Sequence, residues 1–367
     1  MRIAYLFNSS TPSSNPSSIQ VVNTCAAISK LSHEIKLIVP NTGLKFSLSK
    51  FYGIKKTPKL IKLRYFKKFP LGINYYLFSV CAIFYGLYKN TDLFITRNFF
   101  TLFILNLLKK KVIIEVHHDL SNESRIVKFL YRNFKIFNKK NVVKIVAITS
   151  SVRSYLIKNF KVEKKKIDIV PSASSLKFKF SKLKKKKRYK IGYFGSLDES
   201  KGSKFIMNLS KKDNLNDYFI YGGSPEQVLK LKRKNSSKKL KIYPSIPYSK
   251  IKLHISKMDI LLMPSNTTKI RSLGGSGNIA KYTSPLKLFD YLASGKLIMV
   301  SNVKVFKEIL KDRNDCFIMK NFNTNSWINK INKIKFDLKK VNRIKKNAFR
   351  LSKKYTYLTR AQKILNF

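Results

Sequence analysis

The fold of this chain is decided by the stretch SPLKLFDYLASGKLIMVS, residues 284–301. Ser284 can cap a helix whose first residue is Pro285, and Gly295 can end that helix before an apolar strand. Lys287 falls in the first turn, where the helix dipole disfavours a cation unless an anion is bound. The stretch therefore predicts a helix that begins at a bound phosphate. An ordinary capped amphipathic helix is the alternative.

Strand-like apolar runs alternate with helical segments on both sides of this stretch. In the second half they cover residues 189–195, 217–223, 240–243 and 258–264, with a further strand from 297. In the first half they cover residues 2–7, 35–39, 92–96, 111–116, 142–148 and 166–170, with a helix over 19–31. This alternation predicts an α/β protein with two Rossmann-like, doubly wound domains.

The domain boundaries follow from composition. We expect an N-terminal Rossmann-like domain over residues 1–178 and a second Rossmann-like domain over 189–341. The basic, low-complexity residues 179–188 are the predicted linker between them. Residues 342–367 are predicted to be helical, and a family resemblance described below implies that they cross back to the first domain.

The chain is strongly basic. Its 367 residues contain 76 Lys plus Arg against 18 Asp plus Glu, a net charge of +58, while 44% are hydrophobic. That apolar content is sufficient for two cores and excludes disorder as the main state. The charge favours an anionic membrane surface as a partner. No specific nucleic acid is expected, because the lysines are not interleaved with the aromatic pattern of an RNA-binding sheet. A lysine-rich composition bias is the alternative explanation.

The cysteines and the hydropathy pattern bear on localisation. Cys25, Cys81 and Cys316 lie far apart, which indicates neither a disulfide framework nor a zinc site. The N-terminus lacks the order of a signal peptide, so a cytoplasmic protein is expected. Residues 69–88 are uncharged but contain Pro70 and several polar groups. They predict a buried or membrane-facing helix, with a membrane span as the alternative.

Residues 284–301 resemble the nucleotide-sugar signature of retaining group 1 glycosyltransferases (glycosyltransferase family four), in a branch with a Ser-Pro-Leu-Lys element. The family has the GT-B fold, in which two Rossmann-like domains face a cleft. Its two signature glutamates have seven residues between them, and the second holds the nucleotide ribose. Here the second position is Asp290 and the first is Tyr282, so the carboxylate that usually contacts the donor sugar is absent whereas the one for the ribose is present. The resemblance also places the donor at Ser284, Pro285, Leu286 and Lys287.

A second motif, GYFGSLDESKG at residues 192–202, resembles the strand and turn that hold the donor diphosphate in this family. The resemblance implies that Ser196 and Lys201 contact phosphate and that Gly195 lets the backbone approach it. Gly222 and Gly223 resemble the turn beside the nucleotide base.

A third motif, EVHHD at residues 115–119, resembles the family's Glu-x-His element facing the interdomain cleft. By resemblance His117 contacts the donor sugar or its leaving phosphate, with His118 as the alternative inward-pointing residue. Together with Lys201 and Lys287, His117 completes the expected catalytic set. No metal triad accompanies the histidines, so we expect neither a metal nor a cofactor, only a nucleoside-diphosphate sugar as co-substrate.

The acceptor side is expected to involve Ser18, Gln20 and Arg97. Ser18 and Gln20 match a loop that faces phosphate or acceptor in the family, and Arg97 matches an acceptor-side element, with a structural hydrogen-bonding role as the alternative. The glycine-rich residues 271–277 could cover the donor as a mobile loop.

The sequence thus predicts a hexosyltransferase-type enzyme of polysaccharide biosynthesis. It would move a sugar with retention from a UDP- or GDP-sugar to a lipid-linked surface glycan, at the inner face of the membrane. The alternatives are a catalytically degenerate GT-B protein that binds polyanions or anionic membranes and, less favoured, a nucleotide-sugar 2-epimerase.

Overall fold

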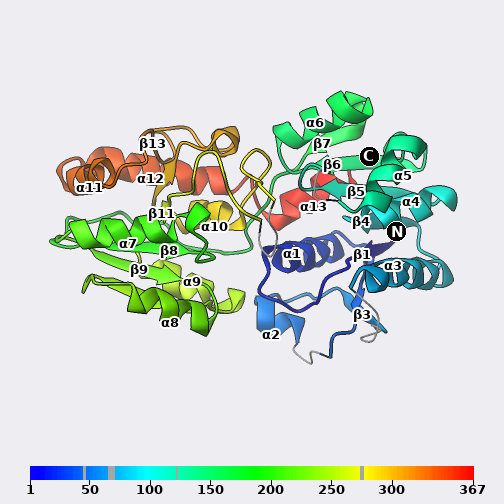
Figure 1. Ribbon diagram of the computed structural model, residues 1–367, viewed down its shortest axis with the longest axis horizontal. Coiled ribbons are helices and arrows are strands. Elements are labelled where there is room, and N and C mark those ends of the chain that lie inside the picture. The colour runs from blue at the N-terminus through cyan, green and yellow to red at the C-terminus, as the bar shows by residue number, and fades with distance from the viewer. Residues whose placement is uncertain (44–46, 65–70, 121–122, 273–276) are drawn as a thin grey trace. The chain divides into compact units, whose positions relative to one another are not determined.

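The computed structural model describes residues 1–43, 47–64, 71–120, 123–272 and 277–367. The chain forms two compact units (Figure 1). The first contains Met1–Ala173 and Tyr357–Phe367, and the second contains Ser174–Thr356. Each unit is a parallel sheet with helices packed on it, which confirms the predicted fold class of two Rossmann-like domains.

The first unit is built on a seven-stranded parallel sheet with the order β3-β2-β1-β4-β5-β6-β7. Its strands are β1 Arg2–Leu6, β2 Glu34–Pro40, β3 Lys59–Leu63, β4 Leu93–Thr96, β5 Val112–Val116, β6 Val142–Ala147 and β7 Ile167–Ile169. Its helices are α1 Pro16–Lys30, α2 Leu48–Tyr52, α3 Leu71–Tyr88, α4 Phe99–Leu107, α5 Arg125–Phe134, α6 Ser150–Phe160, the 3₁₀ turn η1 Lys164–Lys166 and α13 Tyr357–Leu365. The last helix, α13, packs against α1 (Figure 1).

The second unit is built on a six-stranded parallel sheet with the order β10-β9-β8-β11-β12-β13. Its strands are β8 Lys190–Phe194, β9 Asp217–Tyr221, β10 Leu240–Tyr243, β11 Ile260–Met263, β12 Leu297–Ser301 and β13 Phe317–Met319. Its helices and 3₁₀ turns are η2 Glu199–Lys201, α7 Ser203–Lys212, α8 Pro225–Arg233, α9 Tyr248–Ser256, α10 Leu286–Ser294, η3 Lys304–Glu308, α11 Thr324–Lys333, η4 Ile334–Phe336 and α12 Leu338–Ser352.

Both faces of the second sheet are covered, so its central strands β11 and β12 are buried along their whole length, whereas the edge strand β10 alternates buried and exposed residues. Along β8, Ile191 and Tyr193 point into one core, which also holds Trp327. Phe194 points into the core on the other face with Tyr291. A sheet buried on both faces leaves its strand ends as the place where polar side chains can gather.

In each sheet, successive strands are first added on one side of the starting strand and then on its other side. In the first sheet β1 lies between β2 and β4, and in the second β8 lies between β9 and β11. Ligands of open α/β sheets bind beyond the carboxyl ends of the strands at such a switch point. The loops after β5, β8 and β9 and the start of α10 are therefore the segments to inspect for a site.

The chain's division differs from the expected boundaries. The predicted linker, 179–188, belongs to the second unit, because Leu183 is buried in its core and its amide donates to Asn342 Oδ1 at 2.6 Å. Helix α12 also stays in this unit, packed on α10 and β12, so the chain returns to the first unit only at Tyr357. Charge and low complexity indicated a linker, whereas the buried leucine ties the segment to a core.

Two edge strands were not predicted. In β3 two lysines interrupt the apolar run, and its residues are only partly buried or exposed. Strand β13 has only three residues. Edge strands need less apolar surface than central ones, and their sequence signal is correspondingly weak.

The uncharged segment 69–88 coincides with α3, although residues 69 and 70 lie outside the described part. The helix buries Phe78, Ala82 and Ile83 while Phe84 is 59% exposed, so one face packs on the unit. Within the described residues, no helix has both the length and the apolarity needed to cross a membrane.

Candidate active site

Helix α10 begins one residue later than the sequence predicted. Leu286 is its first residue, Pro285 occupies the N-cap position, and no side chain caps the helix. The prediction that Ser284 is the cap and Pro285 the first helical residue was therefore wrong, whereas Gly295 ends the helix in the left-handed conformation (φ 61°) as expected. Without a side-chain cap, the first amide groups of α10 keep their capacity to bind an anion.

Lys287 lies in the first turn of α10 with its amine buried. Its Nζ has no hydrogen-bond partner among the described residues and lies 4.2 Å from the centroid of the Tyr193 ring. A Cβ added to Gly195 would be 3.1 Å from this Nζ, which places the amine against the turn after β8. Burial, followed by the positive charge of Lys201, lowers the pKa of Lys287 to about 7. An unpaired cation in this position is costly unless an anion accompanies it.

The turn after β8 supplies the other polar groups of this cluster. Lys201 is the last residue of η2. Burial lowers the pKa of its amine, and the negative charge of Asp198 raises it by a smaller amount. The hydroxyl of Ser196 is buried and finds no hydrogen-bond partner in the described part of the chain. Two lysines and one hydroxyl thus lie near the start of α10 without an acidic group that neutralises Lys287.

The turns after β8 and β9 contain glycines because their backbones lie very close to each other. A Cβ on Gly222 would lie 1.7 Å from the carbonyl oxygen of Gly195, so no larger residue fits. Gly223 has φ 73°, a conformation that glycine adopts without strain. The two turns are therefore held together at the carboxyl end of the sheet.

Asp290 lies on the buried face of α10, with 3% of its surface exposed. Its Oδ1 accepts hydrogen bonds from Ser174 Oγ at 2.6 Å and from the Tyr248 hydroxyl at 2.9 Å. Burial raises the pKa of Asp290 to about 7, although both hydroxyls favour the ionised form. Ser174 and Tyr248 carry no sequence signal of their own, because each reaches Asp290 from a distant segment.

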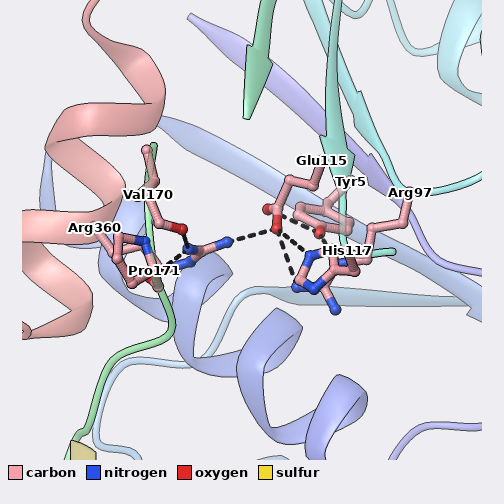
Figure 2. Close-up of polar contacts among 7 residues, drawn as sticks. All are labelled: Tyr5, Arg97, Glu115, His117, Val170, Pro171 and Arg360. Atoms are coloured by element: carbon pink, nitrogen blue, oxygen red, sulfur yellow. Dashed lines mark hydrogen bonds and ion pairs between the residues drawn. The ribbon is translucent and has the colours of Figure 1, made fainter. Parts of the chain in front are cut away.

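The first unit has its own polar cluster at the carboxyl end of β5, around the buried Glu115 (Figure 2). Glu115 Oε2 accepts hydrogen bonds from Arg97 Nη2 at 3.1 Å, His117 Nε2 at 3.1 Å and Arg360 Nη2 at 2.5 Å. Its Oε1 accepts one from the Tyr5 hydroxyl at 3.0 Å. Arg360 comes from α13, so the last helix of the chain completes this cluster.

These contacts determine the protonation of His117. Burial opposes ionisation of Glu115, but Arg360 and Arg97 overcome it and hold its pKa well below the usual range. A carboxylate can only accept hydrogen bonds, so Nε2 of His117 carries the hydrogen. Burial and then the charge of Arg97 lower the pKa of His117 to about 3. The ring is therefore neutral at physiological pH, and Nδ1 is a hydrogen-bond acceptor suited to a hydroxyl and not to a phosphate.

The alternative residue His118 is not part of this cluster. Its side chain is 40% exposed, and its ring contacts the backbone oxygen of Asp119. The structure thus joins His117, and not His118, to the buried carboxylate.

The acceptor-side candidates are held by protein contacts to different extents. Arg97 binds Tyr5 and Glu115, and Ser18 Oγ contacts the hydroxyls of Thr11 and Tyr52 at 3.2 and 2.7 Å. Gln20 is also buried, but its Nε2 has no partner among the described residues.

The remaining candidates lie before α10. Tyr282 is half-buried in a turn, where its amide donates to the carbonyl of Ile279 at 3.0 Å, and Ser284 is also half-buried. Of the predicted covering loop, residues 273–276 lie outside the described part. The residues that the structure describes contain no group of three or more His, Cys, Asp or Glu that could hold a metal.

Comparison with known proteins bears on the fold and on the second unit. Residues 174–351 match the family model described as "Glycosyl transferases group 1". No curated protein matches the chain in sequence.

Three solved structures have the same fold over nearly their whole length. HepE of Anabaena in complex with UDP is 13% identical, with 99% of this chain and 98% of that chain covered and a TM-score of 0.69. Sucrose-phosphate synthase from Thermosynechococcus elongatus is 13% identical, with 99% and 97% covered and a TM-score of 0.72. A glycosyltransferase from Rickettsia africae is 15% identical, with 99% and 96% covered and a TM-score of 0.68.

Nearly the whole second unit is therefore similar to the glycosyl transferases group 1 family, and this match supports a glycosyltransferase enzyme. At these identities the solved structures establish the shared fold, which is that of GT-B glycosyltransferases.

Replacing Lys287 by Met should stabilise the protein without ligand. The pKa of Lys287 is about 7 in the folded state, below its ordinary value of 10.5, so the unfolded state binds this proton more tightly. The variant should exceed the wild type by about 1–4 kcal/mol in free energy of unfolding at pH 7, and the gap should close towards pH 10. Denaturant unfolding at both pH values measures this. Lys204→Met, in the exposed first turn of α7, is the matched control. A less stable Lys287→Met protein at pH 7 would contradict the unpaired cation.

The state of His117 can be read directly by ¹⁵N NMR of the imidazole rings, because the chain has only four histidines. The signal that disappears in His117→Gln should remain neutral from pH 8 to pH 5, with hydrogen on Nε2. Arg360→Met should raise the pKa of His117, since Arg360 contributes a positive charge that lowers it. Arg350→Met, on α12, is the control. A His117 ring that titrates near pH 6.5 in the wild type would disprove the assigned state.

Proposed function

We propose that the chain transfers a sugar from a nucleoside-diphosphate sugar, a UDP- or GDP-sugar, to a surface-glycan acceptor with retention of configuration. One observation carries the proposal: the buried amine of Lys287 has no partner among the described residues and lies at the uncapped start of α10. A diphosphate supplies the missing negative charge and accepts hydrogen bonds from the first amide groups of the helix.

The leaving diphosphate gains negative charge as the glycosidic bond breaks. Lys287 and Lys201 provide positive charge for it in a site that is largely shielded from water, where such charge is most effective. A bound phosphate also raises the pKa of Lys287 from about 7, so the lysine becomes fully protonated when the donor binds. The proposal therefore requires no divalent cation and no cofactor.

The ribose is assigned to Asp290, in accordance with the resemblance of its motif. Ser174 and Tyr248 fix the carboxylate by binding Oδ1. A ribose hydroxyl that donates to this group favours the ionised form and lowers its pKa from about 7. Gly222 and Gly223 are assigned to the nucleotide base.

His117 is assigned a substrate hydroxyl. Its neutral ring offers Nδ1 as an acceptor, and 21% of its side chain is exposed. The buried carboxylate of Glu115 keeps the ring in one orientation and one tautomer, which favours recognition of a hydroxyl in a defined position.

The substrates are proposed from structural neighbours. HepE has been solved with UDP and with UDP-glucose, which supports a nucleotide-sugar donor. WaaB is described as a lipopolysaccharide outer core galactosyltransferase, which supports a lipid-linked glycan acceptor. The net charge of +58 supports peripheral association with the inner face of an anionic membrane.

A panel of UDP- and GDP-sugars tests the donor. We expect one nucleotide sugar to stabilise the wild type in a thermal-shift assay and to be consumed when a glycan acceptor is added. In Lys287→Met, transfer should fall by about a hundredfold or more, whereas Lys204→Met should remain near the wild type. NMR of the product should show the donor's anomeric configuration. Stabilisation by every polyanion, without transfer of any sugar, would identify a polyanion-binding protein instead.

The variant Asp290→Asn tests whether the carboxylate contributes to nucleotide binding independently of protein stability. Because the pKa of Asp290 is raised by burial, its contribution to stability falls as the pH rises from about 4 to 7, and Asn removes this cost. The variant should be as stable as the wild type at pH 8, or more stable. Its affinity for UDP should fall by about 1–3 kcal/mol, as expected for a lost charge-assisted hydrogen bond. Calorimetry with Asp312→Asn, an exposed aspartate, is the control; unchanged UDP affinity in Asp290→Asn would remove the ribose assignment.

A further inference from the structure

A lysine-lined cavity of about 220 Å³ lies in the second unit, away from the candidate active site. Its six lysines are Lys182, Lys184, Lys186, Lys257, Lys296 and Lys345. Asp259 is the single acidic residue in its lining. The volume is well above the roughly 10–15 Å³ that one water molecule needs.

The topology of the sheet separates this cavity from the candidate active site. Asp259 and Lys296 directly precede β11 and β12, and Asp259 Oδ2 accepts the amide of Lys190, the first residue of β8. The cavity therefore lies at the amino ends of these strands. The cluster around Lys287 lies at the carboxyl ends, so the two occupy opposite edges of one sheet.

Among the described residues, the only carboxylate that lines the cavity, that of Asp259, already has partners within the protein. Asp259 Oδ1 forms an ion pair with Lys186 Nζ at 2.7 Å. Lys345 is only 2% exposed and donates to the backbone carbonyl of Ser181 at 3.0 Å, and Lys296 donates to the carbonyl of Ser256 at 2.8 Å. These two lysines are therefore hydrogen-bonded to neutral groups, and the lining carries a large excess of positive charge.

Such an arrangement is unfavourable without an anion. Burial, followed by the positive charge of Lys296, lowers the pKa of Lys345 to about 8, although the charge of Asp259 acts in the opposite direction. Burial lowers the pKa of Lys296 as well. Neutral carbonyls compensate a buried ammonium group incompletely, whereas an anion with several oxygens can bind several lysines at once.

We propose that this cavity binds a phosphate-bearing anion, as a second site distinct from the donor site. Phosphate fits better than a carboxylate, because a phosphate monoester carries about −1.5 to −2 charge and three acceptor oxygens. The lysines act as point charges on flexible stems, which suits phosphate oxygens in varied positions. The anion is either a free phosphorylated compound or the headgroup of an anionic phospholipid. Both present phosphate oxygens, although a diester headgroup carries one negative charge and two free oxygens.

Inorganic pyrophosphate is the probe for the free anion. The Lys287→Met background reduces its binding at the donor site. In this background, replacing Lys184 and Lys257 by Gln should weaken pyrophosphate binding at least tenfold at about 150 mM salt. The matched control replaces Lys211 and Lys212, two exposed lysines of α7, and should change affinity less than twofold. Both pairs remove the same charge, so an effect of net charge alone would be equal in the two.

Lys345→Met tests the buried part of the cavity. The variant should be at least as stable as its parent without ligand, since it removes a buried cation. It should also gain less stability from pyrophosphate in thermal unfolding. A variant that loses stability but keeps the full response to pyrophosphate would assign Lys345 a purely structural role and count against the site.

Sedimentation with vesicles distinguishes the two sources of phosphate. If the anion is a lipid headgroup, the variant at Lys184 and Lys257 should bind phosphatidylglycerol vesicles more weakly than the α7 control does, and neither should bind phosphatidylcholine. If the anion is a free compound, only pyrophosphate binding should change. Equal losses in both paired variants with both probes would overturn the proposal. The donor-site assignment is tested separately, by UDP binding to Lys287→Met.

Discussion

A buried charged group is unfavourable unless a group of opposite charge or a hydrogen bond stabilises it. The two units differ in how they stabilise their buried charges. In the first unit the carboxylate of Glu115 is surrounded by donors, since Arg97, His117, Arg360 and Tyr5 all bind it. In the second unit the ammonium group of Lys287 has no such partner among the described residues. The first arrangement is complete, whereas the second leaves a buried amine without a partner in the described part of the chain, which is why we propose a ligand there.

This difference matches what each cluster can do. The filled shell of Glu115 fixes one tautomer of His117 and keeps it uncharged, so its chemistry is that of a hydrogen-bond acceptor. The buried amine of Lys287 lacks a partner among the described residues, which is costly in the free protein. Under the proposed function, the diphosphate of the donor offsets this cost when it binds.

Much of this architecture is readable from local sequence. The apolar runs predicted eleven of the thirteen strands that the structure describes, and Gly295 marked the end of α10. The start of α10 was predicted one residue too early, since Ser284 and Pro285 have strong preferences for positions that the tertiary structure did not give them. Strands β3 and β13 were missed because edge strands need little apolar surface. The boundary at 179–188 was misplaced because composition does not show that Leu183 is buried.

The sequence by itself determined most of the elements and identified Lys201, Lys287, His117 and Asp290 as candidate site residues. Periodicity, caps and motifs are local properties, and a single chain segment contains them. Only the tertiary structure decided the partners: Arg360 reaches Glu115 from 245 positions away in the chain, and Ser174 reaches Asp290 from 116 positions away. Such pairs depend on how distant elements pack, and that packing determines which buried charges are neutralised and which await a ligand.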